Sequence, residues 1–230
     1  MQLLGHMKLR HSVRENCRRE KGSSGAVVCQ FSSMGSLNEK WLQHEFGASG
    51  APHNTQPAIR LVFPTAKEVC ESVEGYAGGS SLPSNTKNVQ KHFLRSLYRK
   101  WSANDTHNPF SSPYNLPHIK TFFRYGEANE SMEWFVLSSH NISSAAWGQL
   151  QKNGQQFFVR HWELGVFLSP HTLGCNRLVP LLDAASDPDD IAIPLPYKFK
   201  PDAYEASDEP WAWDKTYQRP DAFGRHGLQG

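Results

Sequence analysis

Two residues in the middle of the chain have the types and the spacing for chemistry on a phosphate group. His118 and Lys120 lie two positions apart in PHIKTFFR (residues 117–124), a run with strand character, and residues two apart in a strand point to the same face. A lysine can hold a non-bridging phosphate oxygen while a histidine donates or accepts the proton at a bridging oxygen. The pair therefore predicts general acid and base catalysis of phosphoryl transfer.

A second polar group follows the next apolar run. EWFVLSSHN (residues 133–141) is typical of a buried strand that ends in polar residues, and Ser143 then stands where a helix cap belongs. Asn141 is thereby expected at the mouth of a helix N-terminus, which favours an anion. We expect its side chain to donate a hydrogen bond to the phosphate that His118 and Lys120 address.

A carboxylate lies in the third strand that the sequence predicts, FFVRHWELGVFLSP (residues 157–170). Glu163 is embedded in this apolar run, and a buried carboxylate needs a partner. A histidine ring nitrogen is one candidate, because a carboxylate fixes the imidazole tautomer and raises its basicity. Strand alternation leaves a solvent-facing position on an edge strand equally open.

The His-x-Lys spacing alone is a weak signal, because it occurs twice. His6 and Lys8 repeat it without a strand pattern around them and without an Asn turn after them. We therefore interpret this first copy as a decoy. The second copy gains its specificity from the order of the elements around it: strand, turn, strand, Asn-x-Ser, helix, and a strand with Glu163.

The elements that must position these residues begin with two buried strands, AVVCQF (residues 26–31) and IRLVFP (residues 59–64). The first runs into a small polar turn with Ser33 and Ser36, and Ser36 stands three residues before Glu39, the spacing of a capping box. Such a turn exposes backbone N–H groups at a helix N-terminus, where a phosphate is favoured. An ordinary capped helix start is the plainer explanation of the same spacing.

The clearest helix is predicted over the stretch that ends at Trp101. Apolar residues recur there at every fourth position, and basic residues form a second row at the same step. An anionic partner would relieve the repulsion within the basic row, and an ordinary solvated face would explain it as well. The apolar row consists of Val89, Phe93, Leu97 and Trp101, and the basic row consists of Lys87, Lys91, Arg95 and Arg99.

The composition bounds the class of protein. The 230 residues carry 24 Lys and Arg against 22 Asp and Glu, but residues 1–124 hold 16 basic and 8 acidic side chains (net +8) and residues 125–230 hold 8 and 14 (net −6). This division is consistent with a basic face for an anionic partner. No stretch reaches the roughly 18 apolar residues of a membrane-spanning helix, so no membrane partner is expected. The 4 cysteines form no CxxC pair and have no histidine at zinc-finger spacing, so no metal is expected.

Three segments together resemble a known family. PHIKTFFR (117–124), SSHNISSAAWGQLQKNG (138–154) and WELGVFLSP (162–170) are similar, in order and in flanking residues, to the second catalytic motif of the tyrosyl-DNA phosphodiesterases, the topoisomerase I repair enzymes within the phospholipase D superfamily. The similarity extends over most of residues 27–215. Its further segments are QFSSMGSL, SVEGYAGGSSLPS, YRKWSAND, PLPY and EPWAWD.

The resemblance implies an α/β fold, a phospholipase D-like lobe in which helices flank a mixed β-sheet. Residues 26–215 would form the second catalytic lobe, residues 1–25 a remnant of the first lobe, and residues 216–230 a C-terminal tail. In this family the nucleophile is a histidine of a first His-x-Lys lobe, and only 29 residues precede Gln30. The chain is therefore expected to supply the acid/base lobe without the nucleophile.

The resemblance also implies a function, that of a DNA repair hydrolase that removes a topoisomerase-derived tyrosine from 3′ ends through a phospho-histidine intermediate, without metal or cofactor. His118 would protonate the leaving tyrosine and then activate water, with Glu163 as its support. The partners would be DNA with blocked 3′ ends, single- or double-stranded, and a topoisomerase I-derived peptide, and the location would be the nucleus. The residues expected to bind phosphate are Lys120 and Asn141, and those expected to contact the DNA backbone are Ser33, Ser36 and Ser143.

Two other functions stay open. A homodimeric nuclease would place two copies of His118 face to face, as single-motif members of the superfamily do, and it predicts a two-fold interface beside that residue. A catalytically inactive DNA-end binding module would keep the phosphate contacts alone. Its affinity would fall with salt, because phosphate contacts release counterions.

Overall fold

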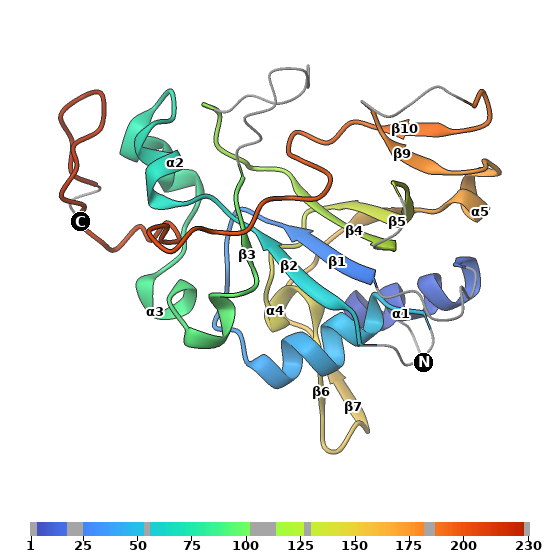
Figure 1. Cartoon of the computed structure of the whole chain (residues 1–230). Coiled ribbons are helices and arrows are strands. Elements are labelled where there is room, and N and C mark those ends of the chain that lie inside the picture. The colour runs from blue at the N-terminus through green and yellow to red at the C-terminus, as the bar shows by residue number, and fades with distance from the viewer. Residues whose placement is uncertain are drawn as a thin grey trace.

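The computed structural model describes residues 4–17, 25–52, 56–101, 114–126, 130–181 and 187–227. Within these residues the centre of the fold is one mixed sheet of 8 strands (Figure 1). Its strands are β1 (Gly25–Gln30), β2 (Ala58–Val62), β3 (Tyr98–Arg99), β4 (Lys120–Gly126), β5 (Met132–Ser138), β8 (Gly165–Leu168), β9 (Leu178–Pro180) and β10 (Ile191–Ile193).

The strand order is β10-β9-β5-β4-β1-β2-β3, and β8 pairs with β5 beside that path. β1, β2 and β3 run parallel, as do β9 and β10. β4 is antiparallel to both β1 and β5, and β8 and β9 are antiparallel to β5. With helices on the sheet, this arrangement confirms the expected α/β fold with a mixed sheet.

Helices cover one face of the sheet, the lower face in Figure 1. Leu9 and Phe46, from two of these helices, belong to the same buried cluster as Cys29 of β1 and Phe122 of β4. The helices on this face are α1 (Gly5–Asn16), the helix over 39–49 with its π-helical middle η1 (Trp41–Gly47), and α4 (Ser144–Trp147). The remaining helices are α2 (Ala66–Cys70), η2 (Gly75–Ser81), α3 (Thr86–Val89), η3 (His92–Leu94) and α5 (Pro170–Leu173).

The C-terminal part of the chain covers the opposite face of the sheet. Tyr197 and Phe199 pack there in a second buried cluster with Val28 of β1 and Phe123 of β4. β1 and β4 are therefore buried along their whole length. Strands that are covered on both faces have near-continuous apolar sequences, which is why the sequence predicted these two.

Both ends of the described chain join the main core. Val13 of α1 and Tyr217 near the C-terminus lie in the same cluster as the central strands. The domain boundaries expected near residues 25 and 215 stay predictions.

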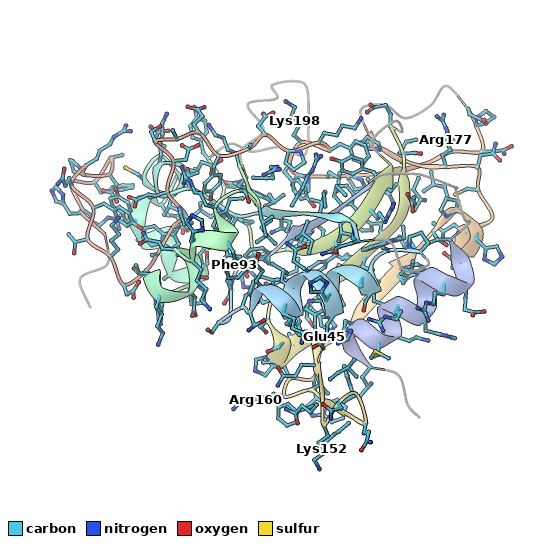
Figure 2. All side chains as sticks on the ribbon, turned by 60° about the horizontal axis from the view of Figure 1, so that its bottom comes forward. Glu45, Phe93, Lys152, Arg160, Arg177 and Lys198 are labelled. Carbon is cyan, nitrogen blue, oxygen red and sulfur yellow. The ribbon has the colours of Figure 1, made fainter. Side chains whose placement is uncertain are left out.

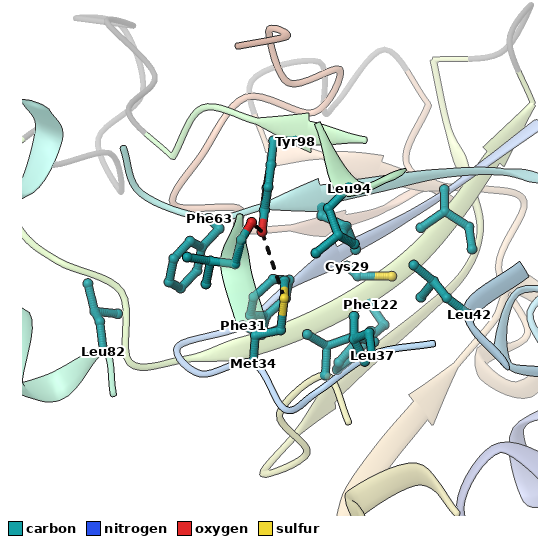
Figure 3. Close-up of a cluster of buried hydrophobic side chains, with 14 of the residues drawn as sticks. Cys29, Phe31, Met34, Leu37, Leu42, Phe63, Leu82, Leu94, Tyr98 and Phe122 are labelled. Atoms are coloured by element: carbon teal, nitrogen blue, oxygen red, sulfur yellow. Dashed lines mark hydrogen bonds between the residues drawn. The ribbon is translucent and has the colours of Figure 1, made fainter. Parts of the chain in front are cut away.

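The prediction of one helix up to Trp101 is wrong. α3 ends at Val89, the 3-10 helix η3 (His92–Leu94) follows, and Tyr98 joins β3, which pairs with β2. Tyr98 Oη donates to Val89 O at 2.7 Å, and its ring lies among the buried side chains around Leu94 (Figure 3). The pairing of Tyr98 and Arg99 with β2 is a tertiary contact, and it overrides the helical periodicity of the sequence.

The basic row disappears with that helix. Arg95 donates to the carbonyl oxygens of Glu205 at 2.7 Å and Ala206 at 2.9 Å. Lys91 instead donates to Ser36 Oγ at 3.0 Å. Lys87 lies in α3, whereas Lys91, Arg95 and Arg99 lie outside α3 and η3, so no helix of the described residues carries the row.

The single strand expected over residues 157–170 is also wrong. β7 (Gln156–Phe158) forms a two-stranded sheet with β6 (Gln149–Gln151), and only β8 belongs to the main sheet. The hairpin turns at Lys152, which has a left-handed backbone with φ 50° and lies at the hairpin's tip (Figure 2). Residues 159–164 then connect β7 to β8, so the two ends of the apolar run belong to two different sheets.

The capping box expected at Ser36 is wrong as well. The helix after β1 is capped by Asn38, whose Oδ1 accepts a hydrogen bond from Trp41 N at 3.2 Å. Gly35 N donates to Ile142 O at 3.1 Å, and this contact holds Ser36 outside the helix. The turn after β1 is therefore fixed by a distant segment rather than by its own helix.

Candidate active site

Four strand ends bring the candidate residues to one edge of the main sheet. Gln30 at the end of β1 lies opposite Thr121 of β4. Lys120 at the start of β4 lies opposite Ser138 at the end of β5, which lies opposite Gly165 at the start of β8. Neighbouring strands are about 4.8 Å apart, so the segments that carry the predicted site residues meet here.

His118 and Lys120 differ in exposure. Lys120 is the first residue of β4 and is buried, whereas His118 precedes the strand and is exposed. Lys120 Nζ donates a hydrogen bond to the His118 carbonyl oxygen at 2.5 Å. Burial lowers the pKa of Lys120, and the Glu163 carboxylate opposes that shift. A partly desolvated ammonium beside an exposed imidazole suits an anionic ligand, because the anion replaces the water contacts that burial removes.

Asn141 ties its own turn to the turn after β1. Its Oδ1 accepts hydrogen bonds from Ser32 N at 3.1 Å, Ser32 Oγ at 3.2 Å and Ser33 N at 2.9 Å. With the oxygen occupied in this way, the amide nitrogen is the part of the side chain that can donate to a ligand. The expected contact between Asn141 and a phosphate stays a prediction.

Ser143 caps α4, as the sequence predicted. Its Oγ accepts a hydrogen bond from Ala146 N at 3.1 Å. The turn after β1 packs directly against this cap, since a Cβ atom on Gly35 would lie 2.7 Å from Ser143 Cβ. Only glycine fits so close an approach, and it locks the two polar turns together.

Ser33 and Ser36 lie at the rim of this edge. Ser33 Oγ donates to Pro83 O at 3.2 Å, whereas the exposed Ser36 accepts a hydrogen bond from Lys91 Nζ at 3.0 Å. Lys91 is a residue that the sequence placed in a helix row instead of at this turn. A phosphate near Ser36 would meet a hydroxyl and an ammonium together.

Glu163 lies just before β8, with 16% of its side chain exposed. Its Oε2 accepts a hydrogen bond from Ser139 Oγ at 2.5 Å, and its Oε1 is 3.8 Å from His161 Nδ1. Among the described contacts its partners are thus Ser139 and His161. The expected support of His118 by Glu163 stays a prediction.

His140 also belongs to the candidate site, although no role was predicted for it from the sequence. Its ring stacks on Trp147 with centroids 4.2 Å apart, and Nδ1 bonds the Ser138 hydroxyl. Burial lowers the pKa of His140 to about 4, while Glu163 opposes the shift. A neutral imidazole therefore stands directly before Asn141.

The other His-x-Lys pair lies in α1. His6 is fully buried, with Nδ1 3.0 Å from Ser49 Oγ and Nε2 3.6 Å from Glu45 Oε2. Figure 2 shows Glu45 on the helix that packs beside α1.

Within the described ranges, no group of three or more His, Cys, Asp or Glu residues could hold a metal ion.

The fold is that of a known class of phosphodiesterase. A crystal structure of the yeast tyrosyl-DNA phosphodiesterase superposes with a TM-score of 0.66, covering 93% of this chain and 54% of that one at 17% identity. This likeness supports the phospholipase D-like fold.

The sequence comparisons identify the family. The tyrosyl-DNA phosphodiesterase family model matches residues 1–205, and the chain belongs to this family. Tyrosyl-DNA phosphodiesterase 1 of Arabidopsis thaliana is 36% identical over 96% of this chain and 42% of its own length. The probable tyrosyl-DNA phosphodiesterase of Caenorhabditis elegans is 32% identical over 86% of this chain and 41% of its own length. The chain therefore spans less than half the length of these relatives.

Proposed function

We propose that this chain supplies the acid/base lobe of a DNA repair phosphodiesterase that hydrolyses 3′-phosphotyrosyl bonds. The observation that carries the proposal is the pairing of Lys120 with Ser138, which brings the segment of His118 and Lys120 beside the segment that leads to Asn141 and its turn. Family membership supports the same chemistry. The nucleophilic histidine comes from residues outside this lobe.

The proposed reaction has two steps. In the first, a histidine nitrogen attacks phosphorus, the bond from phosphorus to the tyrosine oxygen breaks, and His118 gives that oxygen a proton. In the second, His118 takes a proton from water, whose oxygen attacks phosphorus and releases the nucleophilic histidine. Lys120 and the Asn141 amide hold the non-bridging oxygens, where charge builds up in both transition states.

The proposed partners follow from the surroundings of the site. We assign contacts with DNA that has a blocked 3′ end to Ser33, Ser36 with Lys91, and Ser143. This assignment is supported by the packing of the turn after β1 against Ser143. The peptide on the tyrosine would derive from topoisomerase I, the activity would be that of a 3′ exonuclease, and the location would be the nucleus. No helix in the described parts of the chain is long and apolar enough to cross a membrane.

The test is cleavage of an oligonucleotide that ends in a 3′-phosphotyrosine. It is assayed with this chain and with a longer chain in which a first lobe from a full-length relative precedes these residues, each with and without His118→Asn. We expect the longer chain to cleave and its His118→Asn form to accumulate a covalent protein–DNA adduct, because the second step lacks its base. An inactive longer chain, or an unchanged rate after the substitution, would contradict the proposal.

The homodimeric nuclease remains a second candidate because of one observation. Leu137, Leu164, Val166 and Ile119 are exposed at 45%, 83%, 59% and 38% next to the candidate site. Such a group of apolar side chains is suited to a partner surface. Sedimentation separates the candidates, since a monomer that is fully active alone excludes the dimer. A module that binds DNA ends without cleaving them would leave the substrate intact in both chains.

A further inference from the structure

β8 is an open edge of the main sheet beside the candidate site. Among the residues that the structure describes, β8 pairs only with β5, and Gly165 and Val166 are exposed. An edge strand keeps unpaired backbone N–H and C=O groups that can accept one more strand.

The register shows which groups of β8 point outward. Ser139 N donates to Leu164 O at 3.0 Å, so these two opposite residues form a hydrogen-bonded pair. Hydrogen-bonded and non-hydrogen-bonded pairs alternate along antiparallel strands, so Val166 again bonds toward β5. The N–H and C=O groups of Gly165 and Phe167 consequently point to the open edge.

A cavity of about 250 Å³ lies at this edge, between α1 and the sheet. Leu9 and Phe167 are among its apolar walls, and Lys8 and Glu163 add charge. In a strand added to β8, the residues that pair with Gly165 and Phe167 would point to the face that lines the cavity. Backbone pairing and a pocket for a side chain thus occur at the same positions.

The cavity extends to the candidate active site. Its lining includes Glu163, His140 and Ser138, and Ser138 is the register partner of Lys120. Strands lie about 4.8 Å apart, so a strand added beyond β8 would run roughly 14 Å from Lys120. Three strand spacings thus separate a peptide on β8 from Lys120 of the phosphate site, where the leaving tyrosine is bonded.

We propose that β8 receives the peptide carried by the leaving tyrosine as an additional strand. The inference rests on the proposed function and adds the place and manner of peptide binding. Hydrogen bonds to the main chain of Gly165 and Phe167 hold the peptide whatever its sequence, and the cavity takes one of its apolar side chains. Recognition of this kind suits peptides that differ in sequence from one adduct to the next.

The test compares two fluorescently labelled oligonucleotides bound to this chain at equilibrium. One ends in a 3′-phosphotyrosine, and the other ends in the same tyrosine within a short apolar peptide. We expect the peptide adduct to bind about tenfold more tightly, the effect of one or two additional main-chain hydrogen bonds after the cost of ordering the peptide. N-methylation of alternate peptide amides should remove the gain, and N-methylation of the amides between them should leave it.

A matched pair of α1 variants tests the cavity. Ser12 lines the cavity, whereas the neighbouring His11 is exposed and outside the lining. Ser12→Trp should fill the cavity and bring the peptide adduct down to the affinity of the tyrosine adduct, and His11→Trp should change neither. Both variants should bind the tyrosine adduct like the unmodified chain, because neither residue contacts the phosphate site.

The outcomes separate the two proposals. If both adducts bind equally, or if every N-methylated peptide binds alike, the assignment of β8 is wrong while the proposed function stands. If neither adduct binds better than an oligonucleotide with a free 3′ hydroxyl, the proposed function fails, and the assignment of β8 fails with it. A chain dimer that peptide does not dissociate would show that a second copy occupies β8 and would also overturn the assignment.

Discussion

The two His-x-Lys pairs of this chain have the same spacing and opposite environments. His6 is fully buried in α1, whereas His118 is exposed beside the buried Lys120. Two residues apart on a helix point about 200° from each other, whereas His118 lies just before β4 and Lys120 is the first residue of that strand. The secondary structure around such a pair therefore decides whether it can address one ligand, and the burial of its histidine decides whether that residue serves catalysis or stability.

The largest difference should appear when both histidines receive the same substitution. In the longer chain with a first lobe, His118→Asn should lower the cleavage rate by about 10² to 10⁴, the usual contribution of a general acid and base. His6→Asn should leave the rate per folded molecule unchanged, because His6 lies within the core. Single-turnover cleavage of a 3′-phosphotyrosyl oligonucleotide measures both, and a comparable loss of rate in the two variants would contradict the distinction.

Substitution of the two lysines should likewise lower the cleavage rate at the β4 pair and leave it unchanged at the α1 pair. Lys120→Ala removes a buried ammonium from the phosphate site and should lower the rate by about 10² to 10³, as the loss of one preorganised charge does elsewhere. Lys8→Ala, at the wall of the α1 cavity, should leave the single-tyrosine substrate unaffected. The comparison uses the initial rate of cleavage at saturating DNA. An equal effect at both positions would place Lys8 at the phosphate site and refute the assignment.

How far the sequence predicts the fold depends on how each element is held. The strands predicted at 26–31 and 59–64 form because their apolar runs suit a sheet covered on both sides. The helix predicted up to Trp101 fails because Tyr98 and Arg99 pair with β2 as a strand, a contact between distant segments. The prediction of a single strand over residues 157–170 fails for a related reason, since the first part of this run pairs with β6 in a hairpin.

The candidate site shows the same limit. Ser143 could be predicted as a cap because a cap depends on residues within one helical turn. The position of Lys91 at Ser36 could not, because it depends on where the chain goes after η3. The contacts of Asn141 Oδ1 with the turn after β1 were equally beyond a local pattern, since that turn lies more than 100 residues earlier. Local spacing thus finds the residues, and tertiary structure assigns their partners.

For the free energy of unfolding we expect the reverse: the substitution of His6 should have the larger effect and that of His118 the smaller. His6→Asn removes a buried ring that contacts Phe157 and Ser49, and should lower the free energy of unfolding by about 2–4 kcal/mol. His118→Asn changes an exposed side chain and should stay within about 0.5 kcal/mol. Urea unfolding of this chain provides the measurement. Equal losses would mean that His118 is also part of the core.

The free energy of unfolding should depend on pH through the protonation of His6. Burial lowers the pKa of His6 to about 4, from 6.5 for a free histidine. Above pH 6.5 both the folded and unfolded forms are neutral at this residue, and below it the unfolded chain takes up the proton first. Stability is therefore fully present above about pH 6.5 and declines toward pH 4, by roughly 2–3 kcal/mol for His6.

The control for this pH effect is His6→Asn, which should reduce the decline between about pH 7 and about pH 4.5. Part of the decline should persist, because burial also lowers the pKa of His140 to about 4. A decline of the same size in the variant and the unmodified chain would show that His6 is not the group that takes up the proton.

The smallest effect concerns the hydroxyl groups beside the two pairs. Ser49 is buried and bonds His6 Nδ1, so Ser49→Ala leaves a buried ring nitrogen without its partner and should cost about 1–2 kcal/mol of stability. Ser36 is exposed at the rim of the candidate site, and Ser36→Ala should cost less than about 0.5 kcal/mol. Ser36→Ala should instead weaken DNA binding, because it removes the hydroxyl assigned to the DNA backbone, while Lys91 keeps its hydrogen bond to Leu37 O at 2.6 Å. If Ser49→Ala weakened DNA binding to the same extent, the separation between a structural pair in α1 and a chemical pair at β4 would not hold.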